Sequence, residues 1–241
     1  MARSRLPRFT DPQSTERALQ LVSSGDWVRA SVGTSCAWLL RQSHQDKAVQ
    51  IAQSLLAGVE GPAQEPLSRV DLGYLTLTLA EATYLASRVE EANALCNTAL
   101  AHFQAAEHAQ GQSDALFVEA SFAGESTRGD LRASLMARSL DLARTANDEE
   151  RANTSWLALQ IFRLFGSKHG NAEVLEEVTR LASSEDLGTQ ALANCFLMYS
   201  ELDAGNLASA ARYGIQAQAC AIDAGYLSRA IADGSNVGVI F

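Results

Sequence analysis

The sequence predicts an all-α protein, and three observations support that prediction. Of the 241 residues 47% are hydrophobic, and only 4 prolines and 16 glycines interrupt them, so long helices are permitted. Alanine and leucine are common, whereas runs of β-branched residues, which favour strands, are absent. The apolar residues recur at helical spacing along the chain. We therefore expect more than about 60% helix and no sheet.

The clearest structural unit is a helical hairpin that ends at Gly225. An apolar helix from about Leu187 to Leu202 is followed by a turn at Gly205 and Asn206. A second helix then continues to Gly225, which is a natural helix stop. Small residues along this second helix would let the two helices cross closely, as in a compact helix–turn–helix unit.

The same pattern recurs along the chain. Turn residues at Ser87, Gly129, Gly170 and Gly205 are 42, 41 and 35 residues apart, and Gly25 begins an earlier copy. A period in this range is typical of a helical solenoid, in which each hairpin buries its apolar face against its neighbours. We expect helices over residues 12–22, 27–41, 45–59, 67–86, 89–109, 114–122, 129–145, 149–165, 174–181, 187–202, 207–224 and from 226 onward.

The segments between these helices are assigned as turns and loops. Residues 60–66 contain two prolines and a glycine and are expected to be a long loop between hairpins. Residues 111–113 are expected to form a helix cap. Asn147 and Glu150 resemble a capping box, and the carboxylates of residues 148–150 are assigned to the start of a helix rather than to catalysis. Residues 1–12 are expected to be flexible, and residues 13–241 to form one repeat domain.

Three segments share a more specific pattern. In residues 25–37, 87–99 and 205–217, the turn residue is followed by a large apolar residue two positions later and by alanines five and twelve positions later. This pattern resembles the tetratricopeptide (TPR) repeat. The resemblance implies an α–α superhelical solenoid of TPR-like hairpins, whose first helices line a concave groove. The chain departs from the repeat at Ser134 and Val174, where alanine is expected, and several repeats exceed the usual length of about 34 residues.

Long, degenerate repeats of this kind are also similar to the N-terminal sensory regions of bacterial signalling proteins, such as GGDEF-type diguanylate cyclases and some LuxR-type regulators. Residues 226–241 would begin another hairpin that nothing in the sequence completes or caps. We therefore expect residues 1–241 to be the N-terminal part of a longer protein. In isolation, the open end would associate with a second copy.

The net charge of −9 is unevenly distributed. Residues 1–41 carry +3 and the remainder −12. An acidic surface repels nucleic acid and anionic lipid, so neither is an expected partner. The basic residues Arg3, Arg5 and Arg8 are consistent with either contact to an acidic partner or a solvated, flexible tail, and we expect the tail.

The cysteines point to a reducing compartment. Cys36, Cys96, Cys195 and Cys220 have no metal-ligand spacing and lie in apolar helical contexts, so we expect buried, free thiols. The N-terminus lacks the apolar core of a signal peptide, and no apolar run reaches the length of a membrane span. The expected location is therefore the cytoplasm.

No sequence pattern indicates an enzyme, a cofactor or a metal. The phosphate-binding, dinucleotide-binding and nucleophile-elbow glycine motifs are missing from the sequence. His102 and His108 are six residues apart and therefore lie on different faces of a helix. We expect a non-catalytic chain without a cofactor.

One helix face stands out as a candidate binding surface. Asn153, Trp156, Gln160 and Arg163 are spaced three, four and three residues apart and share a face opposite an aliphatic stripe. Such a face either lines a binding groove or serves as ordinary surface or as a contact between repeats. Both interpretations stay open. If the TPR resemblance holds, five further residues would point into the same groove: Tyr74, Glu81, Glu119, Tyr199 and Asp203.

The expected function is therefore that of an interaction or sensory module in a bacterial signalling protein, and the resemblance implies the N-terminal part of a diguanylate cyclase as one example. It would act by binding a protein or peptide in the groove or by self-association. The alternative is a small-molecule sensor domain of a transcriptional regulator, with one deep pocket in place of an extended groove.

Overall fold

The computed structural model describes residues 6–58, 66–122, 129–164 and 172–240. Within these ranges 82% of the residues are helical and none lies in a strand, which confirms the all-α prediction. The expected loop at 60–66 and the turn around Gly170 lie outside the described residues, apart from Pro66. No helix of the described part is long and apolar enough to cross a membrane.

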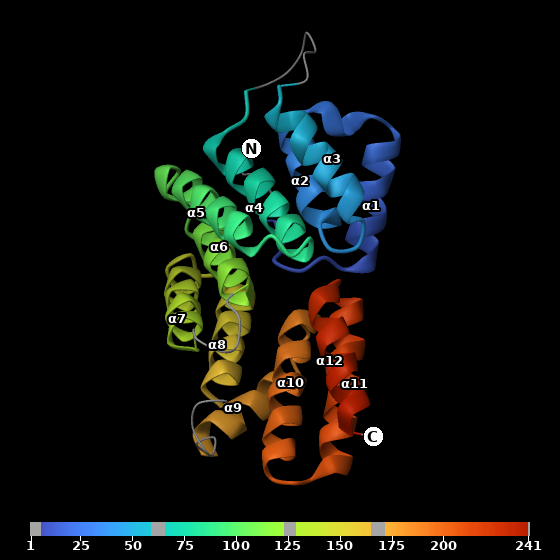
Figure 1. Cartoon of the computed structure of the whole chain (residues 1–241), viewed down its shortest axis with the longest axis vertical. Coiled ribbons are helices and arrows are strands. Elements are labelled where there is room, and N and C mark those ends of the chain that lie inside the picture. The colour runs from blue at the N-terminus through green and yellow to red at the C-terminus, as the bar shows by residue number, and fades with distance from the viewer. Residues whose placement is uncertain (1–5, 59–65, 123–128, 165–171, 241) are drawn as a thin grey trace. The chain divides into compact units, whose positions relative to one another are not determined.

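The chain divides into two compact units, Met1–Phe122 and Ala123–Phe241. In the first unit the helices are α1 (Pro12–Ser23), the 3-10 helix η1 (Asp26–Val28), α2 (Ala30–Leu40), α3 (Gln45–Leu56), α4 (Arg69–Leu85), α5 (Val89–Ala105) and α6 (Ala109–Phe122) (Figure 1). In the second they are α7 (Gly129–Thr145), α8 (Glu149–Leu164), α9 (Ala172–Leu181), α10 (Leu187–Asp203), α11 (Leu207–Asp223) and α12 (Leu227–Ile240).

A single type of turn joins five pairs of consecutive helices. In each turn an alanine is followed by one residue with a positive φ, and the next N–H donates to a carbonyl five residues back, as the N–H of Asn206 does to Glu201 at 2.8 Å. These are Schellman turns, which satisfy the last carbonyls of a helix and start the next helix at once. Each of the five helices that precede these turns has 17 residues. The residues with positive φ are Ser87, Glu107, Asn147, Gly205 and Gly225.

The first unit is built around α4, which packs against α2, α3, α5 and α6. Its core contains Trp38, Tyr74 and Phe103, which meet edge to face through Tyr74 with ring centroids 4.9 Å apart. Gly73 and Gly111 let α4 and α6 approach Phe103 closely, because a Cβ at either position would lie within 2.5 Å of its ring. The aromatic core therefore depends on two glycines within helices.

Gly111 shows that the expected cap at residues 111–113 is wrong. α6 begins at Ala109, so Gly111 lies inside the helix and is buried. We interpreted this glycine as part of a helix cap, but the ring of Phe103 leaves no space for a side chain at this position. A second difference precedes α2, where the 3-10 helix η1 occupies the expected first helical turn at Trp27.

The N-terminal segment also corrects a prediction. Within residues 1–12, which we expected to be flexible, Arg8, Phe9 and Thr10 are buried. Arg8 forms a buried ion pair with Asp114 of α6, with 2.9 Å between Nε and Oδ1. The segment is therefore packed against the helices of the first unit. Arg3 and Arg5 lie outside the described residues.

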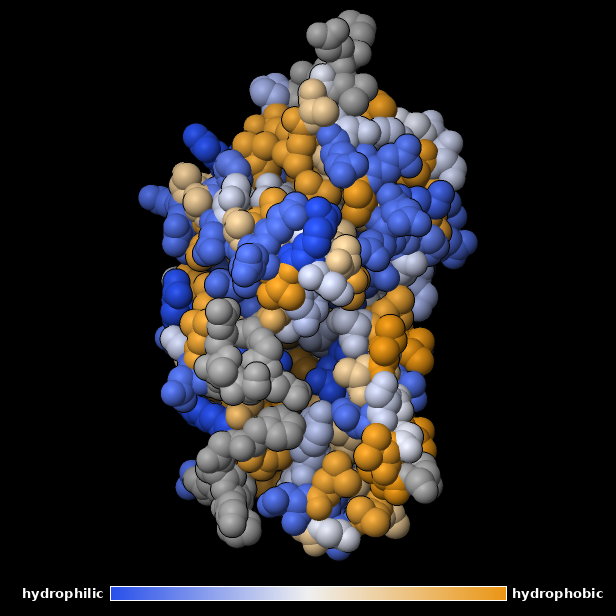
Figure 2. Space-filling model, in the orientation of Figure 1, coloured by the Kyte–Doolittle hydropathy of each residue, from blue (hydrophilic) through white to orange (hydrophobic). Residues whose placement is uncertain are grey.

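The second unit contains two hairpins, α7–α8 and α10–α11. α8 and α9 also pack against α10, and α12 packs against α11. Ala210 and Ala217 are fully buried on α11, as expected for residues at a close helix crossing. Figure 2 shows apolar patches on the visible surface where α10 to α12 lie. Large exposed apolar residues of α11 and α12 are Leu207, Ile215, Ile222, Ile231 and Val239.

Side chains cap some of the helix starts, and one cap differs from the prediction. Asp11 and Asp186 cap α1 and α10 by accepting N–H groups three residues later. Asn147 instead takes the left-handed position of a turn, and Asp148 accepts the N–H of Arg151 at the start of α8. The acidic cluster at residues 148–150 does lie at a helix start, as predicted.

Three of the four cysteines are buried as predicted, and the prediction of burial is wrong for Cys220. Cys36, Cys96 and Cys195 are buried, Cys220 is half-buried, and all four are free thiols.

Candidate functional site

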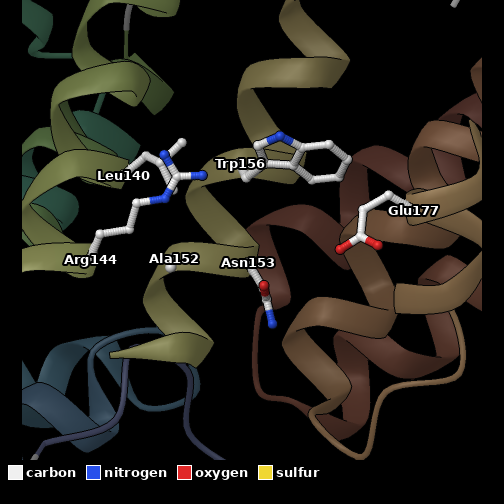
Figure 3. A pocket seen from close by; sticks show the side chains of 6 residues that line it. All are labelled: Leu140, Arg144, Ala152, Asn153, Trp156 and Glu177. Atoms are coloured by element: carbon white, nitrogen blue, oxygen red, sulfur yellow. The ribbon is translucent and has the colours of Figure 1, made fainter. Parts of the chain in front are cut away.

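A pocket of about 210 Å³ lies among α7, α8 and α9 in the second unit. Trp156 is the large aromatic side chain in it, and Arg144 and Glu177 extend toward the indole from opposite sides (Figure 3). The pocket is open to solvent. Its lining residues are Leu140, Arg144, Ala152, Asn153, Trp156 and Glu177.

Helical spacing explains how two helices supply five of these residues. Leu140 and Arg144 are four residues apart on α7, and Asn153 and Trp156 are three apart on α8, so each pair lies on one helix face. The α7–α8 hairpin then brings the two faces together. Leu140 is buried, whereas Asn153 and Trp156 are half-buried. The pocket therefore combines an apolar base with a wall that is accessible to a ligand.

Of the two charged residues of the pocket, Glu177 has an ion-pair partner and Arg144 has none within the described part of the chain. Glu177 accepts two hydrogen bonds from Arg180, at 2.6 and 2.8 Å, and this bidentate contact holds the pKa of Glu177 below its usual value. Arg144 is exposed, and its side chain forms no ion pair within the described part of the chain. Arg144 is therefore the charge in the pocket that is open to an incoming anion.

The structure brings together only two of the residues predicted on the α8 face. Asn153 and Trp156 line the pocket, but Gln160 is 8% exposed and packs into the second unit. Arg163 is exposed in the last turn of α8 and does not line the pocket. On the opposite stripe Leu157 and Ile161 are buried and Leu164 is half-buried, whereas Phe165 lies outside the described residues. The predicted polar face thus consists of a pocket wall, a buried glutamine and an exposed arginine.

The two predicted residues on α10 lie away from this pocket. Tyr199 is partly buried, its hydroxyl accepts a hydrogen bond from Asn236 of α12 at 2.8 Å, and burial raises its pKa. Asp203 is exposed at the last residue of α10.

The three predicted residues of the first unit do not line an open groove. Tyr74 is only 2% exposed and belongs to the aromatic core, so its ring is not available to a ligand from solvent. Glu81 is half-buried and forms an ion pair with Arg41 at 3.2 Å. Glu119 is half-buried on α6. Burial raises the pKa of the Cys96 thiol, and the charges of Glu119 and Glu81 raise it further.

Sequence reasoning missed the pocket residues that α7 and α9 contribute. Leu140 and Arg144 have the same four-residue spacing that identified the α8 face, so that signal was present in the sequence. Glu177 gave no such signal, because its position opposite Trp156 depends on how α9 packs. In the ranges that the structure describes, no group of three or more histidine, cysteine or acidic side chains is placed to hold a metal ion.

Comparison with family models, with curated proteins and with solved structures finds no match to this chain. The comparisons therefore neither support nor exclude the TPR-like and signalling resemblances.

Proposed function

We propose that this chain is a non-catalytic interaction module that binds an extended segment of a partner protein. The pocket beside Trp156 carries this proposal, because it offers an aromatic face, an available guanidinium and a half-buried amide on one surface. Tryptophan and arginine are the residue types that most often dominate protein interfaces.

The size of the pocket favours a polypeptide over an enclosed small molecule. Sites that bury a drug-sized ligand usually measure about 300–1,000 Å³. At about 210 Å³ and open to solvent, this pocket suits one large side chain of a longer ligand. Further contacts would come from neighbouring helix surfaces, as in other extended peptide-binding grooves.

The charges of the pocket indicate what the partner segment carries. Since Glu177 is already paired with Arg180, the available charge is that of Arg144. A planar guanidinium binds a carboxylate through two parallel hydrogen bonds. We therefore propose a segment in which a large apolar or aromatic residue contacts Trp156 and a neighbouring acidic residue contacts Arg144.

The proposal includes two finer predictions from the sequence, a TPR-like solenoid and a role in signalling. The five uniform Schellman turns and the 17-residue helices support stacked TPR-like hairpins that form a solenoid. A solenoid of this kind would serve as the sensory or interaction region of a signalling protein, with any output activity supplied elsewhere.

Charge reversal in the pocket tests the proposal. A random peptide library is selected on the wild-type chain and on the Arg144→Glu variant, with Arg138→Glu as the control. Arg138 is exposed on the same helix but does not line the pocket. We expect acidic–aromatic peptides to be enriched on the wild-type and Arg138→Glu chains only. Equal enrichment of such peptides on the Arg144→Glu chain would contradict the proposal.

The alternative of a small-molecule sensor makes a different prediction. A metabolite that fills the pocket would raise the melting temperature of the wild-type chain, because ligands that bind only the folded state stabilise it. The same metabolite would leave the melting temperature of the Trp156→Ala variant unchanged. A thermal-shift screen of amino acids, nucleotides and organic acids therefore distinguishes the two functions.

A further inference from the structure

A second binding arrangement lies in the first unit, where the segment of residues 6–10 packs against α2 and α6. This segment precedes α1 and is not helical. The carbonyl oxygen of Pro7 accepts a hydrogen bond from the indole N–H of Trp38 at 2.7 Å. The carbonyl oxygen of Arg8 accepts one from the guanidinium of Arg41. Side chains of the helical scaffold thus bind the backbone of the segment.

The side chain of Arg8 fills a site built for an arginine. Its Nε donates to Asp114 at 2.9 Å, and its Nη2 donates to Ser113 at 2.8 Å. The guanidinium also lies over the ring of Phe117, 4.3 Å from the centroid. Arg8 and Asp114 are 2% and 1% exposed. The planar fork of arginine matches this set of partners, whereas the ammonium of lysine does not.

Other groups on the helices hold this site in place. The hydroxyl of Tyr74 donates to Asp114 at 3.3 Å, and Arg41 is held by Glu81 and by the face of the Trp38 ring. Tyr74 and Glu81 are two of the predicted groove residues. Each of the two holds a side chain that binds the segment, Asp114 for Tyr74 and Arg41 for Glu81.

Apolar contacts flank the arginine on both sides. Leu6 packs against the aromatic core cluster, and Phe9 meets Phe117 edge to face with ring centroids 6.0 Å apart. The segment is thus bound through backbone carbonyls, one charged anchor and two apolar side chains. These are the contacts that a helical surface makes with an extended peptide.

We propose that this surface of α2, α4 and α6 is a binding site for an extended, arginine-anchored peptide, and that residues 6–10 are its intramolecular ligand. A segment of another chain with an arginine followed by an aromatic residue binds there by displacing residues 6–10. The proposal does not depend on the pocket of the second unit.

The tethered segment keeps the site closed to competitors. A ligand joined to its site by a short linker competes at an effective concentration in the millimolar range. A free peptide of the same sequence therefore binds the wild-type chain weakly. Loss of the Arg8 side chain opens the site, because the tethered segment then lacks its buried contacts to Asp114 and Ser113.

A labelled peptide of residues 6–12, which contains Arg8 as its only arginine, tests this proposal by fluorescence anisotropy. It is titrated into the wild-type, Arg8→Ala and Arg8→Ala/Asp114→Ala chains. We expect it to bind the Arg8→Ala chain at least about tenfold more tightly than the wild type, since the tethered competitor has lost its anchor. The double variant, which lacks the carboxylate, should not bind it. The Arg8→Ala form of the peptide is the control ligand and should not bind any of these chains.

Circular dichroism shows whether the Arg8→Ala chain folds. If it is unfolded alone, the same peptide should restore its helical signal, and the Arg8→Lys chain provides a second, less perturbed acceptor. The proposal is overturned if the peptide neither binds nor folds the Arg8→Ala and Arg8→Lys chains at about 1 mM, the range of the effective concentration. It is also overturned if the control peptide binds as tightly.

Discussion

Buried arginines paired with nearby carboxylates occur in both units. Arg8 pairs with Asp114 in the first unit, and Arg151 pairs with Asp148 at 2.9 Å in the second. Moving both charges out of water is costly, and their attraction offsets that cost only when both partners are present. The Arg8 pair joins the N-terminal segment to α6, whereas the Arg151 pair lies within the start of α8. Neither pair is expected to add much net stability.

Removing one partner of such a pair should be far more damaging than removing one partner of an exposed pair. Arg151→Ala removes the guanidinium that lies 2.9 Å from the buried carboxylate of Asp148 and should lower the free energy of unfolding by about 3–5 kcal/mol. Arg88→Ala breaks an exposed pair with Glu91 that has the same three-residue spacing, and should cost at most about 1 kcal/mol. Urea unfolding measures both, and equal losses for the two variants would show that the Arg151 pair is not buried.

The thiols should differ in reactivity according to their burial. Burial raises the pKa of Cys36 to about 11 and that of Cys195 to about 12. At pH 8 only about one Cys36 side chain in a thousand is then the nucleophilic thiolate, and this fraction rises as the pH approaches 11. Cys220 is half-buried and should be alkylated first. Mass spectrometry after timed labelling checks the order, and Cys36 labelling as fast as Cys220 would contradict it.

At the scale of the helices, the effect of replacing a glycine depends on how closely a neighbouring side chain approaches it. Gly111→Ala places a Cβ 2.3 Å from the Phe103 ring and should lower the free energy of unfolding by about 1–3 kcal/mol. Gly238→Ala, where nothing lies within 4 Å, should raise it by about 0.5–1 kcal/mol through helix propensity. Denaturant unfolding of both variants tests this difference, and a stabilising Gly111→Ala would exclude the described contact.

Helical periodicity predicted the helices well, because it depends only on local sequence. The bounds of α7 were predicted, and those of α10 to within one residue. The errors occurred where distant residues decide the outcome. Gly111 has the sequence signature of a cap, but the ring of Phe103 determines its role. The expectation of a flexible tail failed because the partner of Arg8 is Asp114, 106 residues further along the chain.

Only the part of the candidate site that lies on one helix could be predicted from local sequence. Asn153 and Trp156 share a helix face, which the sequence shows directly. Their pocket also needs Arg144 from α7 and Glu177 from α9, and only packing brings those helices together. Periodicity along one helix does not contain that information.

At the scale of the whole molecule, we expect the exposed apolar residues of α11 to promote self-association. Ile215 and Ile222 lie two turns apart on one face and are 52% and 50% exposed. Sedimentation equilibrium should detect a dimer of the wild-type chain, and the Ile215→Ser/Ile222→Ser variant should weaken it by about tenfold or more, since burying each isoleucine contributes about 1.5–3 kcal/mol. Leu85→Ser, at an exposed leucine of the first unit, is the control. A wild-type chain that stays monomeric at high concentration would contradict this prediction.

Recognition of an extended polypeptide through Trp156 is the proposal on which the binding predictions depend. Parallel selection of a random peptide library on the wild-type, Trp156→Ala and Trp27→Ala chains tests it, because Trp27 is also half-buried but lies in the other unit. We expect a shared acidic–aromatic consensus on the wild-type and Trp27→Ala chains that is missing on the Trp156→Ala chain. The same consensus on all three chains, or no enrichment on any, would contradict the proposed recognition.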